Sequence, residues 1–254
     1  MNFDYKTFST RNVGFVTEVE QARLRDGAVF IAGVGGMGGA CLASLVRAGV
    51  GRIAIADIDR FEVSNLNRQV FADLDTLGLE KSAASAAAVK RINPEIALEV
   101  FGDDWTLRLP EIAKRYPVIV NGCDDIAATI QLYRVAREQG ATVIDAYAAP
   151  LPSVTLVRPF APRPEERLRY PTRGTAWNAI AKTDIRAAFL KELEYVLTHS
   201  SAAHHIDLGI AAEVAAGKRS RMSFAPMVIT TGNLMAYEAL QALMGRASHT
   251  DHRG

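Results

Sequence analysis

Short apolar runs alternate with longer amphipathic stretches in the first half of the 254-residue chain. The apolar runs predict buried strands, because a strand with one face in water would alternate apolar and polar residues. The predicted strands are 29–32, 53–56, 96–101, 118–120 and 141–145, and the predicted helices between them are 37–48, 82–92, 109–115 and 126–139. This alternation predicts an α/β fold with a Rossmann-like, mostly parallel sheet and helices on both faces.

The pattern changes after residue 150. Residues 153–157 predict one more strand, an antiparallel extension of the sheet, and further helices are expected over 184–197 and 227–244. Four prolines and four arginines fall within residues 159–173, so we expect no regular structure there and interpret the segment as a mobile cover over the site or a surface loop. Residues 1–16 and the tail after Gly245 are expected to be irregular.

The glycines after the first predicted strand fit the pattern GxGxxG. Gly33, Gly35 and Gly38, with Gly36 between them, stand directly between a strand and a helix. Such a turn lets the backbone approach a phosphate, and the following helix N-terminus offers free N–H groups to the anion. Asp57 ends the next strand, where a carboxylate can accept hydrogen bonds from a ribose diol. These residues predict a nucleotide site, and by themselves they also fit NAD.

A polar segment downstream favours a triphosphate over a dinucleotide. It contains Asn65, Arg68 and Gln69, and Arg68 provides a forked donor suited to phosphate oxygens. Lys81 is predicted in the first turn of a helix, where a lysine is unfavourable against the helix dipole unless it serves an anion. For each of these residues a solvated side chain remains the alternative.

Asp125 follows the strand predicted at 118–120, at the sheet edge where ligands gather in doubly wound folds. A carboxylate there can bind Mg²⁺ together with phosphate oxygens, and it can also cap the next helix. The histidines at 199, 204 and 205 lack cysteine or paired carboxylate neighbours, so we do not interpret them as a metal site.

Composition excludes several classes of protein. The net charge of +1 gives no support to a nucleic-acid or membrane-surface partner. No apolar run reaches the roughly 20 residues needed to span a bilayer, and the first residues do not form a signal peptide. The two cysteines, Cys41 and Cys123, do not suggest a disulfide scaffold, and they are expected to be packing residues. We therefore expect a cytoplasmic protein.

Together, these spaced motifs resemble the ThiF/MoeB family, the bacterial relatives of ubiquitin-activating enzymes. The resemblance extends from Arg11 to about Asp145 and returns weakly over 225–244. It implies one domain over 1–254, with a nucleotide-binding core at 11–145 and a substrate-side or dimerisation part at 146–245. It also implies ATP and Mg²⁺ as cofactors and adenylation of a substrate carboxylate, which gives an acyl-adenylate and pyrophosphate.

Site roles carried over from the family are matched position by position. The phosphate turn would be formed by Gly33, Gly35, Gly36 and Gly38, and the ribose would be held by Asp57. The triphosphate would be contacted by Asn65, Arg68 and Gln69, and Lys81 would neutralise the α-phosphate. Asp125 would hold Mg²⁺, and Arg11 would reach the partner's ATP site in a homodimer. Arg68, Lys81, Asp125 and Arg11 would then be the catalytic residues.

The chain also departs from the family. It has no cysteine after Cys123, so neither the family's zinc with its two CxxC pairs nor a catalytic cysteine can be built, and no zinc is expected. The expected substrate is the C-terminus of a small ubiquitin-like or sulfur-carrier protein, or a peptide or small-molecule carboxylate. Three alternatives stay open: a tRNA-modifying carboxylate-activating cyclase, an NAD-dependent oxidoreductase, and a non-catalytic nucleotide-binding protein.

Overall fold

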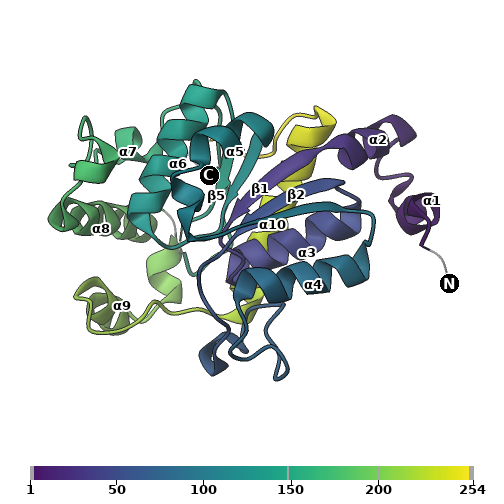
Figure 1. Ribbon diagram of the computed structural model, residues 1–254. Helices are drawn as coiled ribbons and strands as arrows, with labels where there is room; N and C mark the ends of the chain where they lie inside the picture. The colour runs from purple at the N-terminus through teal and green to yellow at the C-terminus, as the bar shows by residue number, and fades with distance from the viewer. Residues whose placement is uncertain (1–2, 148, 200, 252–254) are drawn as a thin grey trace.

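The computed structural model describes residues 3–147, 149–199 and 201–251. In these residues the strands form one six-stranded sheet in the order β3-β2-β1-β4-β5-β6 (Figure 1). The strands are β1 (Ala28–Ala32), β2 (Arg52–Ala56), β3 (Ala97–Phe101), β4 (Val118–Asn121), β5 (Thr142–Asp145) and β6 (Thr155–Val157). Strands β1 to β5 are parallel and β6 is antiparallel to β5. The predicted fold class is confirmed, including the antiparallel extension.

Helices cover both faces of the sheet, and short 3-10 turns connect several of them. The helices are α1 (Tyr5–Ser9), α2 (Glu18–Asp26), α3 (Gly36–Ala48), α4 (Lys81–Ile92), α5 (Leu109–Arg115), α6 (Ile126–Gln139), α7 (Pro164–Arg167), α8 (Lys182–Thr198), α9 (Leu208–Ala215) and α10 (Ala225–Met244). Helices α3, α4 and α10 pack on one face, and α5 and α6 pack on the other (Figure 1). Helices cover both faces of β1. Its consecutive residues Phe30 and Ile31 point to opposite faces, pack in separate cores and are both fully buried.

The strand order reverses at β1, which lies between β2 and β4. The backbone N–H of Gly33 donates to Ala56 O at 2.7 Å, and that of Gly122 donates to Ala32 O at 2.7 Å. These bonds hold the turn after β1 against the carboxyl ends of both neighbouring strands. In doubly wound sheets, ligands bind in the crevice at such a switch point.

The N-terminal segment is more ordered than the prediction of irregular structure. The side chain of Asp4 caps α1 by accepting a hydrogen bond from Thr7 N. The Tyr5 hydroxyl donates to Gly49 O at 2.6 Å and accepts from Gln21 Nε2. Distant partners therefore fix a helix too short to be stable alone, and the sequence window does not reveal them.

Residues 159–173 are also better packed than predicted. They contain α7, and Arg134 of α6 pairs with Glu165 while it donates to the carbonyl oxygens of Thr172 and Thr175. Tyr170 is only 3 % exposed. The prediction of no regular structure is wrong at 164–167, where Glu165 and Glu166 pair with Arg134 and Arg137 of α6.

The tail after Gly245 is docked rather than frayed. Arg246 pairs with Glu20 of α2, with 2.6 Å between Nε and Oε1. The N–H of Leu156 in β6 donates to Asp251 O at 2.8 Å. The prediction of a frayed tail is therefore wrong for residues 246–251.

None of the helices in the described part of the chain has the length and the apolar character that crossing a bilayer requires.

Candidate nucleotide site

At two of the predicted glycines, the packing of the turn leaves no room for a side chain. Gly33 has a positive φ of 82°, and a Cβ there would lie 2.7 Å from Gly122 O. A Cβ on Gly38 would lie 1.9 Å from Gly33 O. Only glycine fits at these positions, because the contacting atoms belong to the backbone.

Gly35 differs, because the space in front of it is open. A Cβ on Gly35 would find no atom closer than the Gln69 amide, at 3.6 Å. Gly35 is also the N-cap of α3, and it gives the helix no side-chain cap. The N–H groups at the start of α3 are therefore free of a side-chain acceptor, which is the arrangement that binds a phosphate.

Gly36 and Gln69 complete the surroundings of this turn. A Cβ on Gly36 would lie 2.5 Å from Val228 Cγ1 and 4.0 Å from Arg68 Cγ, so Gly36 also allows α10 to pack against the turn. Gln69 is 7 % exposed, and within the described part of the chain its Oε1 has no hydrogen-bond partner. A buried amide oxygen without a partner is costly, and a bound ligand with hydroxyl or amino groups could satisfy it.

Asp57 connects the end of β2 to the glycine turn. Its Oδ2 accepts from Val34 N at 2.8 Å and its Oδ1 accepts from Asp59 N at 3.0 Å. Burial raises the pKa of this carboxyl, and the two backbone hydrogen bonds oppose that rise. Each oxygen keeps capacity for one more donor, so both can still receive a ribose hydroxyl.

Lys81 begins α4 as predicted, and the structure shows which group it faces. Its Nζ lies 2.8 Å from Asp59 Oδ2, and the side chain of Lys81 is 9 % exposed while that of Asp59 is 65 % exposed. Asp59 was not among the predicted site residues. The signal was available, because Asp57 and Asp59 form an Asp-x-Asp pair at a strand end. A phosphate bound at Lys81 would share the ammonium with Asp59.

Arg68 lies at the surface beside the glycine turn. Its Nη1 donates to Ser64 O and Asn67 Oδ1, both at 2.8 Å. Asn65 is buried, and its Oδ1 accepts from Glu62 N at 3.0 Å. Asn65 thus caps its own 3-10 turn, while Arg68 keeps donors that can turn toward a ligand.

Asp125 is the N-cap of α6, as the capping interpretation predicts. Its Oδ1 accepts from Ala127 N at 2.8 Å and from Ala128 N at 3.2 Å. Its other oxygen makes no hydrogen bond within the described chain, so it can meet a cation. No group of three or more His, Cys, Asp or Glu side chains in the described residues is arranged to hold a metal. An ion at Asp125 would need other ligands, and phosphate oxygens with water fit Mg²⁺.

Arg11 stands far from this site in its own chain. It lies in a 3-10 turn at Thr10–Asn12, and the next residue, Asn12, donates to Ala48 O at the last residue of α3. The glycine turn lies at the opposite end of this 13-residue helix, a distance of roughly 20 Å at 1.5 Å per residue. Arg11 is exposed, and within the described residues its side chain makes no hydrogen bond or ion pair. It cannot complete the site of its own chain.

A buried polar network at the ends of β4 and β5 was not predicted. Asp145 Oδ2 accepts from Asn121 Nδ2 at 3.1 Å and from the Tyr133 hydroxyl at 2.7 Å. The Cys123 thiol donates to Asn121 Oδ1 at 3.0 Å, and burial raises its pKa to about 12. Cys123 is therefore a protonated packing residue. Cys41 is fully buried inside α3, as predicted.

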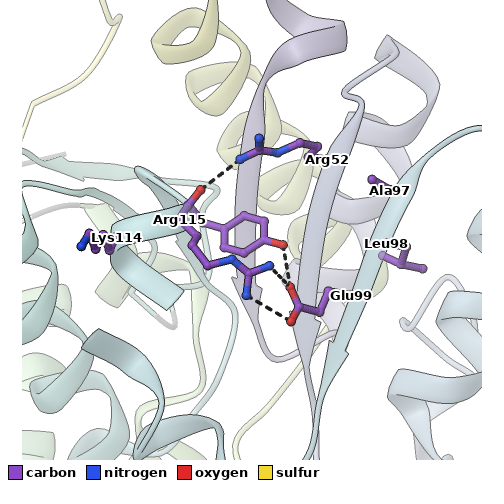
Figure 2. Close-up of a pocket in the computed structure, with 7 residues that line it drawn as sticks. Arg52, Ala97, Leu98, Glu99, Lys114 and Arg115 are labelled. Carbon is purple, nitrogen blue, oxygen red and sulfur yellow. Dashed lines mark hydrogen bonds and ion pairs between the residues drawn. The ribbon is translucent and has the colours of Figure 1, made fainter. Parts of the chain in front are cut away.

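A cleft in another part of the molecule lies away from the glycine turn. It has a volume of about 610 Å³ and lies at the amino ends of β2 and β3, opposite the glycine turn. Figure 2 shows Arg115 bound to Glu99, and Arg52 reaching the backbone oxygen of Arg115. These internal pairs occupy most of the charged groups that line the cleft.

Comparison with known proteins identifies the family. Residues 9–253 match the ThiF family. The chain is 35 % identical over 106 residues to the sulfur carrier protein adenylyltransferase of Thermus thermophilus, covering 41 % of this chain and 39 % of that protein. It is 34 % identical over 110 residues to the adenylyltransferase and sulfurtransferase MOCS3 of Mus musculus, covering 42 % of this chain and 23 % of that protein. The chain thus spans less than half the length of these curated relatives.

Solved structures share the fold. The Escherichia coli tRNA N6-threonylcarbamoyladenosine dehydratase TcdA has a TM-score of 0.67 at 18 % identity, over 94 % of this chain and 95 % of that chain. Escherichia coli MccB with ATP has a TM-score of 0.65 at 17 % identity, over 96 % of this chain and 62 % of that chain. At these identities the likeness establishes the fold alone. The family match extends over nearly the whole sequence, and this chain belongs to the ThiF family.

Proposed function

We propose that the protein uses ATP to adenylate a substrate carboxylate. The observation that carries this proposal is the buried amide oxygen of Gln69, which has no hydrogen-bond partner among the described residues, beside the start of α3, with the Lys81 ammonium at the same edge of the sheet. Free N–H groups and two cations, Lys81 and Arg68, suit a triphosphate better than the pyrophosphate of a dinucleotide. Named relatives are adenylyltransferases, which supports the same reaction.

In the proposed reaction a carboxylate oxygen attacks the α-phosphorus of ATP. A new oxygen–phosphorus bond forms, the bond to pyrophosphate breaks, and an acyl-adenylate results. Asp57 and Gln69 would orient the nucleoside, and Arg68 and Lys81 would stabilise charge on the phosphates. Mg²⁺ at Asp125, when bound, would neutralise the leaving pyrophosphate. Because the protein forms no covalent bond, positioning and electrostatics would provide the rate acceleration.

The acyl group would pass directly to an external or internal nucleophile, and AMP would leave as the acyl–phosphate bond breaks, since the sequence has no cysteine after Cys123 and burial raises the pKa of the Cys123 thiol. A sulfur-carrier C-terminus is supported by the Thermus thermophilus relative, and a peptide is supported by the MccB structure with MccA. A second candidate is a tRNA-modifying dehydratase, because the likeness to TcdA covers 95 % of that chain.

ATP binding tests the proposal without knowledge of the acyl substrate. Calorimetry with ATP–Mg²⁺ should show saturable binding, and Lys81→Met should weaken it about tenfold or more, which is at least about 1.4 kcal/mol. The fold should survive, because the carboxylate left by Lys81 is mostly exposed. Pyrophosphate exchange with candidate peptide and small carboxylates then identifies the substrate.

Lys114→Met provides the matched control, since Lys114 is an exposed lysine that lines the remote cleft. Its ATP affinity should equal that of the wild type. Tighter binding of NAD than of ATP, or unchanged ATP affinity in Lys81→Met, would contradict the proposal.

We further propose a homodimer in which Arg11 reaches the partner's nucleotide site. The support is its position: Arg11 is exposed, it is roughly a helix length from its own glycine turn, and its side chain makes no described hydrogen bond or ion pair. An arginine held in this way has its full set of donors available for a phosphate on another subunit.

Mixing two variants tests this arrangement once sedimentation has established the oligomeric state. Arg11→Ala and Lys81→Met should each lose high-affinity ATP sites. Random exchange of subunits should restore roughly a quarter of the sites, because half of the dimers are mixed and each has one intact site. No recovery after demonstrated exchange would place Arg11 outside the site.

A further inference from the structure

A second polar cluster lies beyond β5, outside the nucleotide site. Its centre is the guanidinium of Arg167, at the last residue of α7. The guanidinium lies 4.6 Å from the ring centre of Tyr195 and 5.7 Å from that of Tyr147. Its Nη2 donates to the Tyr147 hydroxyl at 2.5 Å. Two aromatic rings and one hydrogen bond thus hold the cation in place.

Arg167 differs from Arg134, Arg137 and Arg163, each of which pairs with a carboxylate. Arg134 pairs with Glu165, and both Arg137 and Arg163 pair with Glu166. Within the described residues Arg167 has no such partner. Its Nε is buried without a hydrogen bond, and its Nη1 group is unbonded but not buried. Nη1 is therefore open to a ligand.

Two carboxyls that act electrostatically on Tyr147, those of Asp145 and Glu192, bond to other groups. Asp145 accepts hydrogen bonds from Asn121 and Tyr133. Glu192 Oε1 accepts from the Tyr170 hydroxyl at 2.5 Å, and burial raises the pKa of Glu192 to about 7. Neither neutralises Arg167. A half-buried guanidinium without a counter-ion is costly, so an external anion would be bound favourably.

The position of the cluster relates it to the nucleotide site. Tyr147 comes two residues after β5, and β5 is the neighbour of β4, whose carboxyl end leads to Asp125. Because Arg167 contacts Tyr147, and Asp125 follows the carboxyl end of β4, Arg167 and Asp125 lie toward the same edge of the sheet. The predicted phosphate ligands lie on the other side of Asp125, toward β1 and β2. Arg167 is thus displaced from the phosphates in the direction away from the glycine turn.

We propose that Arg167 binds a second carboxylate of the acyl substrate, one that does not react. The substrate class is then an acid with at least two carboxylates, such as a peptide with an acidic side chain. A planar guanidinium with free N–H groups matches a carboxylate in shape and charge. The binding of an anion at Arg167 stands on the geometry above, and its assignment to the acyl substrate rests on the proposed function.

Nuclear magnetic resonance of ¹⁵N-arginine-labelled full-length protein tests the site directly. The Nε–H of Arg167 should give a protected signal that disappears in Arg167→Lys. Titration with sodium glutarate should move this signal saturably. Titration with sodium chloride at the same ionic strength should leave it in place.

Arg137 and Arg163 are internal controls, because their Nε atoms are also buried without a partner while each guanidinium already pairs with Glu166. Their signals should not move. An Arg167 signal that ignores glutarate, or that moves only in parallel with the controls, would overturn the inference. Saturation transfer from the protein to glutarate should fall several-fold in Arg167→Met and persist in Arg173→Met, an exposed arginine nearby.

ATP calorimetry on the same samples separates the two proposals. Normal ATP–Mg²⁺ binding with a silent Arg167 refutes this inference and leaves the proposed function standing. A responsive Arg167 without ATP binding supports the anion site and refutes the proposed function.

Discussion

Gly35→Ala should remove ATP binding from a folded protein, whereas Gly38→Ala should prevent folding. The two glycines are three residues apart in the same turn, but they face different surroundings. A Cβ at Gly38 would lie 1.9 Å from a backbone oxygen, and the backbone cannot yield without displacing α3 from β1. A Cβ at Gly35 would meet only the amide of Gln69 at 3.6 Å, and it would project into the space proposed for the phosphates.

Circular dichroism and calorimetry distinguish these outcomes. Gly35→Ala should keep the wild-type spectrum and lose at least about tenfold in ATP affinity, because the added methyl group keeps the phosphate from the N–H groups of α3. Gly102→Ala is a control for loss of a glycine far from the turn, since its φ is −82° and the nearest atom to its Cβ position is Asp104 Oδ1 at 3.8 Å. Unchanged ATP affinity in Gly35→Ala would place the phosphates elsewhere.

Arg134→Met should destabilise the protein by about 3–5 kcal/mol, because it leaves the buried carboxylate of Glu165 without its counter-ion. The two side chains are 18 % and 4 % exposed, and Nη2 of Arg134 lies 2.5 Å from Oε1 of Glu165. The same arginine holds the carbonyl oxygens of Thr172 and Thr175. Its loss should therefore loosen the whole segment from α7 to residue 175, and with it the position of Arg167.

Chemical denaturation measures this effect. Arg115→Met is the matched control, because Arg115 also pairs with glutamates, but its side chain is 44 % exposed and water can replace the interaction. It should change stability little. Equal destabilisation by the two variants would show that burial is not the source of the effect. The double variant Arg134→Met with Glu165→Met should recover part of the loss, since both charges are then removed.

The regular core could be predicted from the sequence because its determinants are local. The helix α6 begins after Asp125 and ends before Gly140 as predicted, since an N-cap carboxylate and a left-handed C-cap glycine fix the two ends. Strands β1, β2, β4 and β5 could be predicted from their apolar runs alone, because nearly all of their residues are buried. Asp57 and Lys81 were also placed correctly at a strand end and a helix start.

The partners of these residues could not be predicted. Lys81 faces Asp59 across 22 positions of sequence, and Arg134 faces Glu165 across 31. Such pairs depend on which elements become neighbours, and that is a property of the complete sheet order.

The sequence by itself determined the glycine turn, the acid after β2 and the series of cations that favour a triphosphate, because each depends on spacing along one or two elements. Only the tertiary structure decided which glycines pack and which one leaves open space. It also placed Arg11 out of reach of its own site and gave Arg167 no counter-ion among the residues that the structure describes. Each of these features lies where segments far apart in the sequence pack together. The residues of those segments set the contacts and the space that are available there.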